Sequence, residues 1–352
     1  MFTWRTLAVA LILASAVAGW RSGAHAQRPT TTTAQAPART APAQPAPTVQ
    51  APAPQAPAVQ APTVPATQAP APSRPYDPYI DGAPALDPID PLMPEPSADV
   101  PGVWKSLDKS VRSIAAGYQG RMSVVAVDLK SGARYEFRPH DRYYPASTFK
   151  LPVTLCVLEA IQRGELTWET AVEFTRADDD TVGQGGFATT KYGTWWPVRN
   201  LVDRSLISSN NVAVKMLART LTWDGLKRCT EAMGGMVTRT EDGSTPVTAG
   251  DEAAWWMRLW TVQQERPAAA ENLLRPLRQV PYWGRIQAGT PHPELVTHKF
   301  GTYPPYEHDG AIVWGKQPYI LVVLTHGGSH DAADGAIAQV ATAAWNSIMT
   351  AK

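Results

Sequence analysis

The strongest constraint on this chain is an abrupt change of composition near residue 101. Residues 27–101 hold 20 prolines and 17 alanines in 75 positions, whereas the 251 residues that follow hold only 13 prolines. Proline lacks a backbone N–H and fixes φ, and a segment this poor in large apolar residues cannot bury a core. We therefore expect residues 27–101 to be a disordered, extended tether, and residues 102–352 to fold as one domain.

The first 26 residues have the layout of a secretory signal peptide. Leu7 to Ala18 form a twelve-residue apolar run preceded by Arg5, and Ala24-His25-Ala26 is a small-x-small cleavage pattern. The run is too short to span a bilayer. We expect cleavage after Ala26 and a secreted or periplasmic protein, with an uncleaved anchor as the alternative.

Charge and cysteine content exclude several classes of protein. The formal net charge is only +1, which argues against a nucleic-acid binder held by a basic surface. Two cysteines, Cys156 and Cys229, are too few for a four-thiolate zinc site or a disulfide-stapled scaffold. Both lie in apolar, helix-like stretches. We therefore expect two buried thiols, with a disulfide as the alternative that an oxidising compartment permits.

The folded part mixes strands and helices. Short apolar runs predict strands, and apolar residues at helical spacing predict helices. The predicted strands cover 123–128, 134–137, 311–314 and 319–325, and the predicted helices cover 104–116, 147–164, 211–221 and 332–349. Strands at both ends with helices between them predict an α+β fold. Its antiparallel sheet is built from both ends of the domain, and an all-α lobe is inserted.

Ser147 and Lys150 form an SxxK motif, the first part of the candidate catalytic site. At the start of a helix, positions i and i+3 share one face, so the amine can reach the hydroxyl. The positive end of the helix dipole also lies at the serine. Pro152 is tolerated only near a helix start, so the first turn must lie close to Ser147. Ser106 and Lys109 have the same spacing but lie on a polar helix beside the tether.

Two further motifs follow in chain order. Ser209-Asn210-Asn211 is an SxN sequence ahead of an apolar helix, and Lys299-Phe300-Gly301-Thr302 is a KxG sequence followed by a strand-like stretch. Lys130 and Lys191 also begin KxG sequences, but the first lies in a predicted hairpin turn and the second precedes the SxN motif. The ordered set of three motifs, within a matching pattern of elements, indicates acyl transfer by a serine.

The sequence resembles a known family at these three motifs. The stretches YYPASTFKLPVTLCVLEAI, LISSNNVAVKML and VTHKFGTYPPYEHDGAIVWGKQPYILVVLTHG look like the signature regions of class A β-lactamases. They are also similar to those of the related penicillin-recognising active-site serine hydrolases. The resemblance covers roughly residues 103–350. It implies an α/β lobe, an all-α lobe and a catalytic site between them.

Acyl transfer explains why these residue types occur together. A serine hydroxyl is a weak nucleophile, and the Lys150 amine can take its proton if burial and the nearby charge of Lys299 lower the pKa of that amine. The resemblance implies that Ser147 attacks an amide carbonyl and that Ser209 passes a proton to the leaving nitrogen. It also implies that Lys299 attracts the substrate carboxylate and assists proton relay, while Asn211 holds the substrate's side-chain amide.

The third motif combines expected and unexpected features. By resemblance, the backbone N–H groups of Ser147 and Thr302 form an oxyanion hole, and Gly301 and Thr302 contact the substrate. Phe300 replaces the hydroxyl residue of the usual K[ST]G sequence. Thr302 alternates to the same strand face and is the expected substitute. Further along, Asp309-Gly310 stand where many relatives place an arginine.

The interval between the second and third motifs departs most from the family pattern. The Glu-x-x-Leu-Asn loop of the β-lactamases is absent, and the stretch looks shortened; its nearest carboxylates are Glu241 and Asp242. In the family that glutamate positions the water that hydrolyses the acyl-enzyme. Acylation is therefore expected to proceed normally, while release of the acyl group could be slow.

Two weaker constellations compete with the serine site. His326 and His330, with Asp331 beside them, are four residues apart and could bind a metal, although the intervening glycines are poor helix formers. A Ser-His-Asp triad that uses His308 and Asp309 is compatible with the spacing. An ordinary solvent loop is the alternative for the histidine pair, and nothing in the sequence selects the triad.

Three functions remain open at this point. The first is a class A β-lactamase-like serine hydrolase that opens β-lactam rings through a Ser147 acyl-enzyme. The second is a DD-carboxypeptidase-type penicillin-binding protein that acts on peptidoglycan stem peptides and deacylates slowly. The third is a tethered, non-catalytic binding module. The expected partners are a small-molecule β-lactam or a stem peptide, with the cell wall as a candidate contact of the tether. No nucleic acid, metal or organic cofactor is expected.

Overall fold

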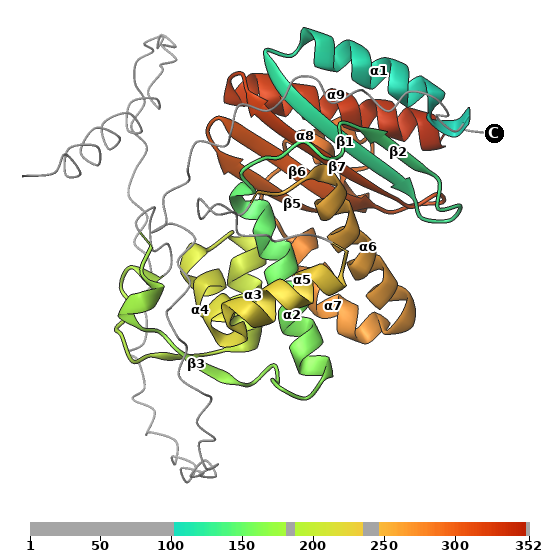
Figure 1. The fold of residues 1–352 in the computed structure, drawn as a ribbon. Helices are drawn as coiled ribbons and strands as arrows, with labels where there is room; N and C mark the ends of the chain where they lie inside the picture. Colours follow the sequence, from blue (N-terminus) through green and yellow to red (C-terminus); the bar gives the residue numbers. More distant parts are fainter. Residues whose placement is uncertain (1–101, 181–186, 235–245, 350–352) are drawn as a thin grey trace, which may run out of the picture. The chain divides into compact units, whose positions relative to one another are not determined.

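The computed structural model describes residues 102–180, 187–234 and 246–349. The predicted signal peptide and tether, and the carboxylates Glu241 and Asp242, lie outside these residues. Across the described ranges, no helix combines the length and apolar character needed to cross a membrane. The description below therefore concerns the domain that begins at Gly102 (Figure 1).

A five-stranded antiparallel sheet forms the centre of one lobe (Figure 1). Its order is β2-β1-β7-β6-β5, so a strand from the start of the domain pairs with a strand from its end, and Val125 lies opposite Val322. The strand bounds are β1 Gly120–Asp128, β2 Arg134–Phe137, β5 Val296–Tyr303, β6 Tyr306–Val313 and β7 Tyr319–Gly327. The prediction of a sheet built from both chain ends is confirmed.

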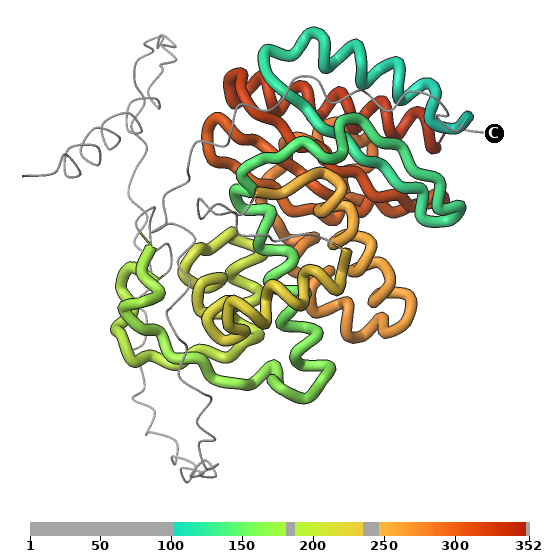
Figure 2. Tube along the Cα trace, viewed as in Figure 1, coloured from blue at the N-terminus to red at the C-terminus, as the bar shows by residue number. Residues whose placement is uncertain are grey.

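The two faces of the sheet belong to two hydrophobic cores. Along β1, Val124 and Ala126 join one core, whereas Val125 and Val127 join the other, as strand alternation requires. One face is covered by helices from the two ends of the domain (Figure 2): α1 Lys105–Gly117, α8 Arg285–Gly289 and α9 His330–Met349. The other face packs against the helical lobe, chiefly through α6 and α7.

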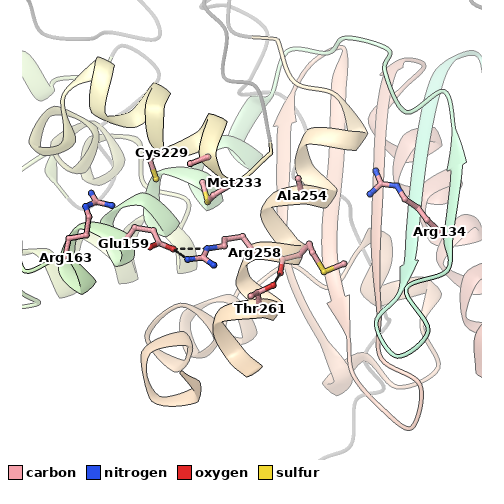
Figure 3. A pocket seen from close by; sticks show the side chains of 10 residues that line it. Arg134, Glu159, Arg163, Cys229, Met233, Ala254, Arg258 and Thr261 are labelled. Carbon is pink, nitrogen blue, oxygen red and sulfur yellow. Dashed lines mark hydrogen bonds and ion pairs between the residues drawn. The ribbon is translucent and has the colours of Figure 1, made fainter. Parts of the chain in front are cut away.

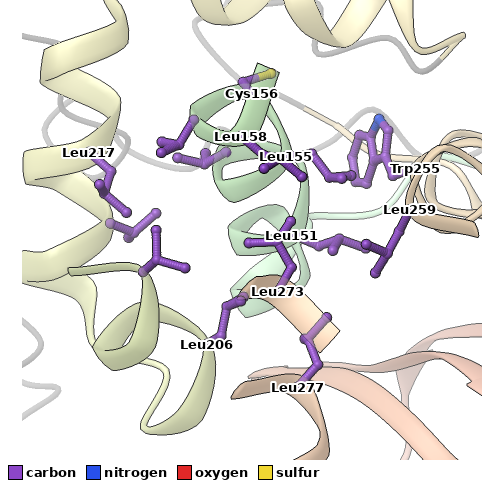
Figure 4. Packing of buried hydrophobic residues seen from close by; sticks show 14 of the residues in the cluster. Leu151, Leu155, Cys156, Leu158, Leu206, Leu217, Trp255, Leu259, Leu273 and Leu277 are labelled. Atoms are coloured by element: carbon purple, nitrogen blue, oxygen red, sulfur yellow. The ribbon is translucent and has the colours of Figure 1, made fainter. Parts of the chain in front are cut away.

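Helix α2 (Lys150–Gln162) is the central helix of the all-α lobe. Ten of its thirteen residues are buried, so it carries apolar side chains all round, as a helix enclosed by others must. Figure 4 shows Leu151, Leu155 and Leu158 packed among leucines of the surrounding helices. Those helices are α3 Val198–Ile207, α4 Asn211–Leu221, α5 Trp223–Ala232, α6 Ala249–Glu265 and α7 Pro267–Arg278. The predicted α+β class is confirmed.

The remaining elements are short. A two-stranded sheet, β3 Ala171–Glu173 with β4 Trp195–Pro197, lies at the edge of the helical lobe. The 3₁₀ turns are η1 Gly102–Trp104, η2 Ala146–Phe149, η3 Arg176–Asp178 and η5 Pro293–Leu295. Of these, η2 is the one that carries a sequence motif, because it contains Ser147.

Cys156 of α2 and Cys229 of α5 form a disulfide, so the expectation of two thiols is wrong. Both cysteines do lie on helices, as predicted. The local sequence shows an apolar helical context for each, but it does not show that α2 and α5 pack side by side. Their packing brings the two Cα atoms to 5.9 Å, a separation at which a bridge can close.

We expect reduction of this disulfide to destabilise the domain. The bridge joins residues 73 positions apart, and the chain-entropy model gives about 4 kcal/mol for a loop of that size. Urea unfolding with and without reductant measures the change in the free energy of unfolding. The double variant Cys156→Ala/Cys229→Ala should not respond to reductant. A fully reduced wild-type protein with an unchanged midpoint would contradict the prediction.

Candidate active site

Ser147 lies in η2, which runs directly into α2. Pro152 is the third residue of that helix, so the predicted position of the first turn is confirmed. Ala146 has φ 47°, a left-handed conformation that costs energy for a residue with a Cβ. The sharp turn leaves Ser147 partly exposed, while Ala146 and Thr148 on either side are buried.

The amine of Lys150 lies inside the protein and in contact with the serine. Its Nζ is 2.8 Å from Ser147 Oγ and 2.8 Å from Asn211 Oδ1, and the side chain is fully buried. Burial lowers the pKa of Lys150 well below its ordinary value, and the charge of Lys299 lowers it further, although Asp180 acts in the opposite direction. The lowered pKa favours the unprotonated amine, which is the form that can accept the hydroxyl proton.

The SxN motif lies at the start of α4 and contacts Lys150 through Asn211. Asn210 caps α4, because its side chain accepts a hydrogen bond from the N–H of Ala213. Asn211 is consequently the first residue of the helix, and its side chain reaches Lys150. Ser209 has φ 53°. Its Oγ is buried, and within the described ranges it has no hydrogen-bond partner, which suits a group that awaits a substrate.

The third motif lies on β5, which packs directly against the nucleophile turn. A Cβ built on Gly301 would lie 3.0 Å from the backbone N of Ser147 and 3.1 Å from the Pro145 carbonyl oxygen. Lys299 is buried, and its Nζ donates to the Phe300 carbonyl at 2.7 Å. Burial lowers the pKa of Lys299 to about 7, opposed by the charge of Asp309. At position 301, a side chain would crowd the nucleophile turn, so a glycine suits the close approach of β5.

Arg285 is the residue of this region that the sequence analysis missed. It lies on α8 and is fully buried, and its guanidinium donates to the carbonyls of Gly301 at 2.8 Å and His308 at 2.6 Å. Its charge is balanced by ion pairs with Glu307 and Asp334. The sequence carries no motif at this arginine, and its carboxylate partners are 22 and 49 residues away.

Arg285 also explains the unusual third motif. The ring of Phe300 stacks on Tyr282 at 4.5 Å, and the Arg285 guanidinium lies 5.7 Å from that ring. The same guanidinium donates to Thr302 Oγ1 at 2.8 Å. Phe300 and Thr302 therefore share a strand face, as predicted. The chain has Asp309-Gly310 rather than an arginine on the strand after Lys299. The guanidinium of Arg285 reaches the third motif from α8.

The triad that uses His308 and Asp309 is not formed. His308 Nε2 donates to the Tyr144 carbonyl at 2.8 Å, while its Nδ1 accepts from the N–H of Thr325 at 3.2 Å. Burial lowers the pKa of His308 to about 4. Asp309 lies on the opposite face of β6, where the ring of His298 is 3.1 Å away. The hydrogen bonds of both residues therefore go to partners other than Ser147.

The predicted histidine pair does not gather a metal site. His326 packs against Tyr306 with ring centroids 4.8 Å apart, whereas His330 Nδ1 lies 2.9 Å from Glu307 Oε1. Glu307, His330 and Asp334 do bring three ligand atoms within 4.8 Å of one another. However, Arg285 already forms ion pairs with both carboxylates, so a positive charge fills the place that a cation would take.

The alternative motif matches lie on other elements, and Ser106 and Lys130 are on a helix and in a hairpin turn, as predicted. Ser106 is on α1, where its Oγ is 2.7 Å from Ser347 Oγ of α9. Lys130 lies in the turn between β1 and β2, and Lys191 lies between β3 and β4.

A cavity of about 540 Å³ lies between the far end of α2 and helices α5 and α6 (Figure 3). Its walls include Glu159 and Arg258, whose side chains pair at 2.8 Å, and the disulfide residue Cys229. Glu159 is nine residues beyond Lys150, about 14 Å along the helix. This cavity is therefore separate from the serine site.

Comparison with known proteins identifies the family. A model described as the beta-lactamase enzyme family matches residues 106–348. The chain belongs to this family. A curated beta-lactamase from Streptomyces cellulosae is 25% identical over 247 residues, which cover 64% of this chain and 79% of that protein. The residues that the family model matches include all three motifs.

Solved structures share the fold. A beta-lactamase from Sphaerobacter thermophilus superposes with a TM-score of 0.62 at 19% identity, over 71% of this chain and 99% of that one. A mutant of PBP-A, solved as an acyl-enzyme complex with penicillin G, superposes with a TM-score of 0.61 at 17% identity, over 68% of this chain and 95% of that one. These likenesses show that the chain has the β-lactamase fold.

We expect Gly301→Ala to slow acylation of Ser147. The added methyl would press on the backbone of the nucleophile turn, and small displacements of reacting groups cost roughly 10²-fold in rate. Gly335→Ala on α9 is the matched control, because a Cβ there meets nothing within 4 Å. The rate of covalent labelling by benzylpenicillin, followed by intact mass, measures the effect. Equal rates for the two variants would show that the close approach of β5 is unimportant.

Proposed function

We propose that this protein is a serine hydrolase that opens β-lactam rings through an acyl-enzyme on Ser147. The observation that carries the proposal is the 2.8 Å contact between Ser147 Oγ and the buried amine of Lys150. Membership of the beta-lactamase enzyme family gives this contact its chemical context. The substrate would enter between the nucleophile turn, α4 and β5, where Ser209 and Lys299 also lie.

Each acylation step has a residue suited to it. Lys150 takes the hydroxyl proton, Ser147 Oγ attacks the lactam carbonyl, and the carbonyl oxygen becomes an oxyanion beside the N–H groups of Ser147 and Thr302. The ring C–N bond then breaks, and Ser209 delivers a proton to the leaving nitrogen. The positive form of Lys299 holds the substrate carboxylate. An ester on Ser147 remains.

Hydrolysis of that ester separates the main proposal from its alternative. Water must be activated by a base, and the sequence lacks the Glu-x-x-Leu-Asn loop that supplies one in the family. A penicillin-binding protein of the DD-carboxypeptidase type, with slow deacylation, is therefore the second candidate. The similarity to the PBP-A acyl-enzyme supports it. In that case the natural substrate would be a peptidoglycan stem peptide.

The proposed location follows from the N-terminal sequence. We propose that the leader directs the chain out of the cytoplasm and that the proline-rich segment spaces the domain from its surroundings, with the cell wall as its contact. Both substrates, β-lactams and stem peptides, occur outside the cytoplasmic membrane, so this location agrees with either activity.

We expect benzylpenicillin to acylate Ser147 and to be consumed catalytically. Intact mass over time measures the adduct, and absorbance measures loss of the β-lactam. Ser147→Ala should abolish labelling, whereas Ser106→Ala should leave it intact. A persistent adduct without turnover would favour the penicillin-binding alternative. Absence of both adduct and turnover would leave the tethered binding module.

We expect Lys150→Arg, which puts a permanently charged side chain beside Ser147, to lose most of the acylation rate. An arginine side chain does not deprotonate in proteins, so the general base is removed, which costs roughly 10²–10⁴-fold. Lys109→Arg, in the other SxxK sequence, is the matched control and should acylate normally. The rate of benzylpenicillin labelling checks this. A variant that keeps the wild-type rate would mean that another group takes the serine proton.

A further inference from the structure

Glu252 is a buried carboxyl group beneath the nucleophile turn that the mechanism above does not use. It lies in the first turn of α6, is 1% exposed, and contacts the hydroxyl of Thr148, the residue that follows Ser147. Thr148 itself is 2% exposed. An isolated buried carboxylate is costly, so the partners of this group decide which protonation state it adopts.

The contacts of the Thr148 hydroxyl bear on the protonation state of Glu252. Thr148 Oγ1 lies 2.7 Å from the Pro145 carbonyl oxygen and also contacts Glu252 Oε1. A hydroxyl has one proton to donate, and a carbonyl oxygen can only accept. If Thr148 donates to Pro145, the proton in the contact with Glu252 must come from the carboxyl group. In the alternative, Thr148 donates to an ionised Glu252 and the Pro145 carbonyl keeps the N–H of Thr148 at 3.1 Å as its donor. That alternative places a carboxylate in a fully buried position, which is costly, so we favour the arrangement in which Glu252 is neutral.

The surrounding charges favour the same state. The pKa of Glu252 is raised to about 8. Burial is the main cause, and Asp309 on β6 and Asp251 on α6 act in the same direction, while the Thr148 hydroxyl and Lys299 on β5 oppose it. The carboxyl group also approaches β6 closely. A Cβ on Gly310 would lie 3.2 Å from Glu252 Oε2. The same Cβ would lie closer still to the indole nitrogen of Trp256, so a glycine at 310 makes room for Trp256 and for this acid between α6 and the sheet.

We propose that Glu252 is a positioning residue for acylation, a neutral acid that donates a hydrogen bond to Thr148 and thereby holds the turn that presents Ser147. The inference rests on the proposed function, since acylation of Ser147 is the step that it serves. Glu252 acts through Thr148 and does not touch the substrate. The hydrogen bond from Glu252 connects α6 to the turn between Pro145 and Lys150. It thereby holds Ser147 in position relative to β5.

The protonation state is tested by comparing the wild-type protein with Glu252→Gln. A folded acid that keeps its proton up to about pH 8, against about 4.3 when unfolded, makes the folded state less favoured as pH rises between those values. We expect the wild-type folding equilibrium constant to fall by about tenfold per pH unit relative to that of Glu252→Gln, and the difference to level off above pH 8. Urea unfolding at several pH values measures it. Parallel curves would overturn the inference.

The positioning role is tested by benzylpenicillin labelling of Ser147. Glu252→Met keeps the approximate volume without a donor, and we expect about tenfold slower acylation. Glu252→Gln keeps a donor and should recover most of that loss. Thr148→Val removes the acceptor and should be slow whether or not Glu252 is also changed, because the two groups act together. Glu159→Gln is a control in which a partly buried glutamate is altered away from the site.

The outcomes distinguish the two proposals. If benzylpenicillin acylates the wild-type protein, and Glu252→Met and Thr148→Val are acylated at the same rate, the positioning role is wrong. The proposed function would stand. Failure of benzylpenicillin to label the wild-type protein would count against the proposed function, and a fluorophosphonate probe of Ser147 would then give the same comparison of variants. If Glu252→Met does not fold, Thr148→Val and the pH dependence of Glu252→Gln decide the matter.

Discussion

The burial of the Lys150 amine is the interaction on which the active site depends. Lys150 and Lys299 are 0% and 1% exposed, and two ionised amines enclosed together would pay for desolvation as well as repulsion. Burial and the charge of Lys299 both lower the pKa of Lys150, which favours loss of its proton next to the serine hydroxyl. The two lobes have to meet for this to happen, because Lys150 begins a helix of the all-α lobe and Lys299 lies on the sheet.

The parts of the site that depend on local geometry could be predicted from the sequence. Ser147 and Lys150 meet because positions i and i+3 of a helical turn share a face. Asn210 caps a helix because its short amide suits that position, and this fixes where Asn211 points. Strand alternation correctly placed Phe300 and Thr302 on one face. The strands and helices themselves followed from hydrophobic periodicity, and the sheet from their placement at both ends of the domain.

The parts that depend on long-range packing could not be predicted. The disulfide depends on α2 and α5 lying side by side, and the local sequences of Cys156 and Cys229 describe only their own helices. Arg285 reaches the third motif from another element. Its buried charge is balanced by carboxylates that β6 and α9 bring near it. Glu252 looks like a helix-surface residue until its contact with Thr148, 104 positions away, is seen.

The sheet also separates the buried charges behind the third motif. On one face of β5 and β6, Arg285 is balanced by Glu307 and Asp334, and Asp309 lies against His298. Lys299 points to the opposite face, where its amine donates to a carbonyl and where Glu252 approaches Gly310. An ionised Glu252 would attract the Lys299 charge and compete with a substrate carboxylate. A neutral Glu252 does not form that competing pair, although it also gives up the charge interaction by which an ionised Glu252 raises the pKa of Lys299. The proton on Glu252 therefore steadies the nucleophile turn and leaves the substrate carboxylate without a competitor for Lys299.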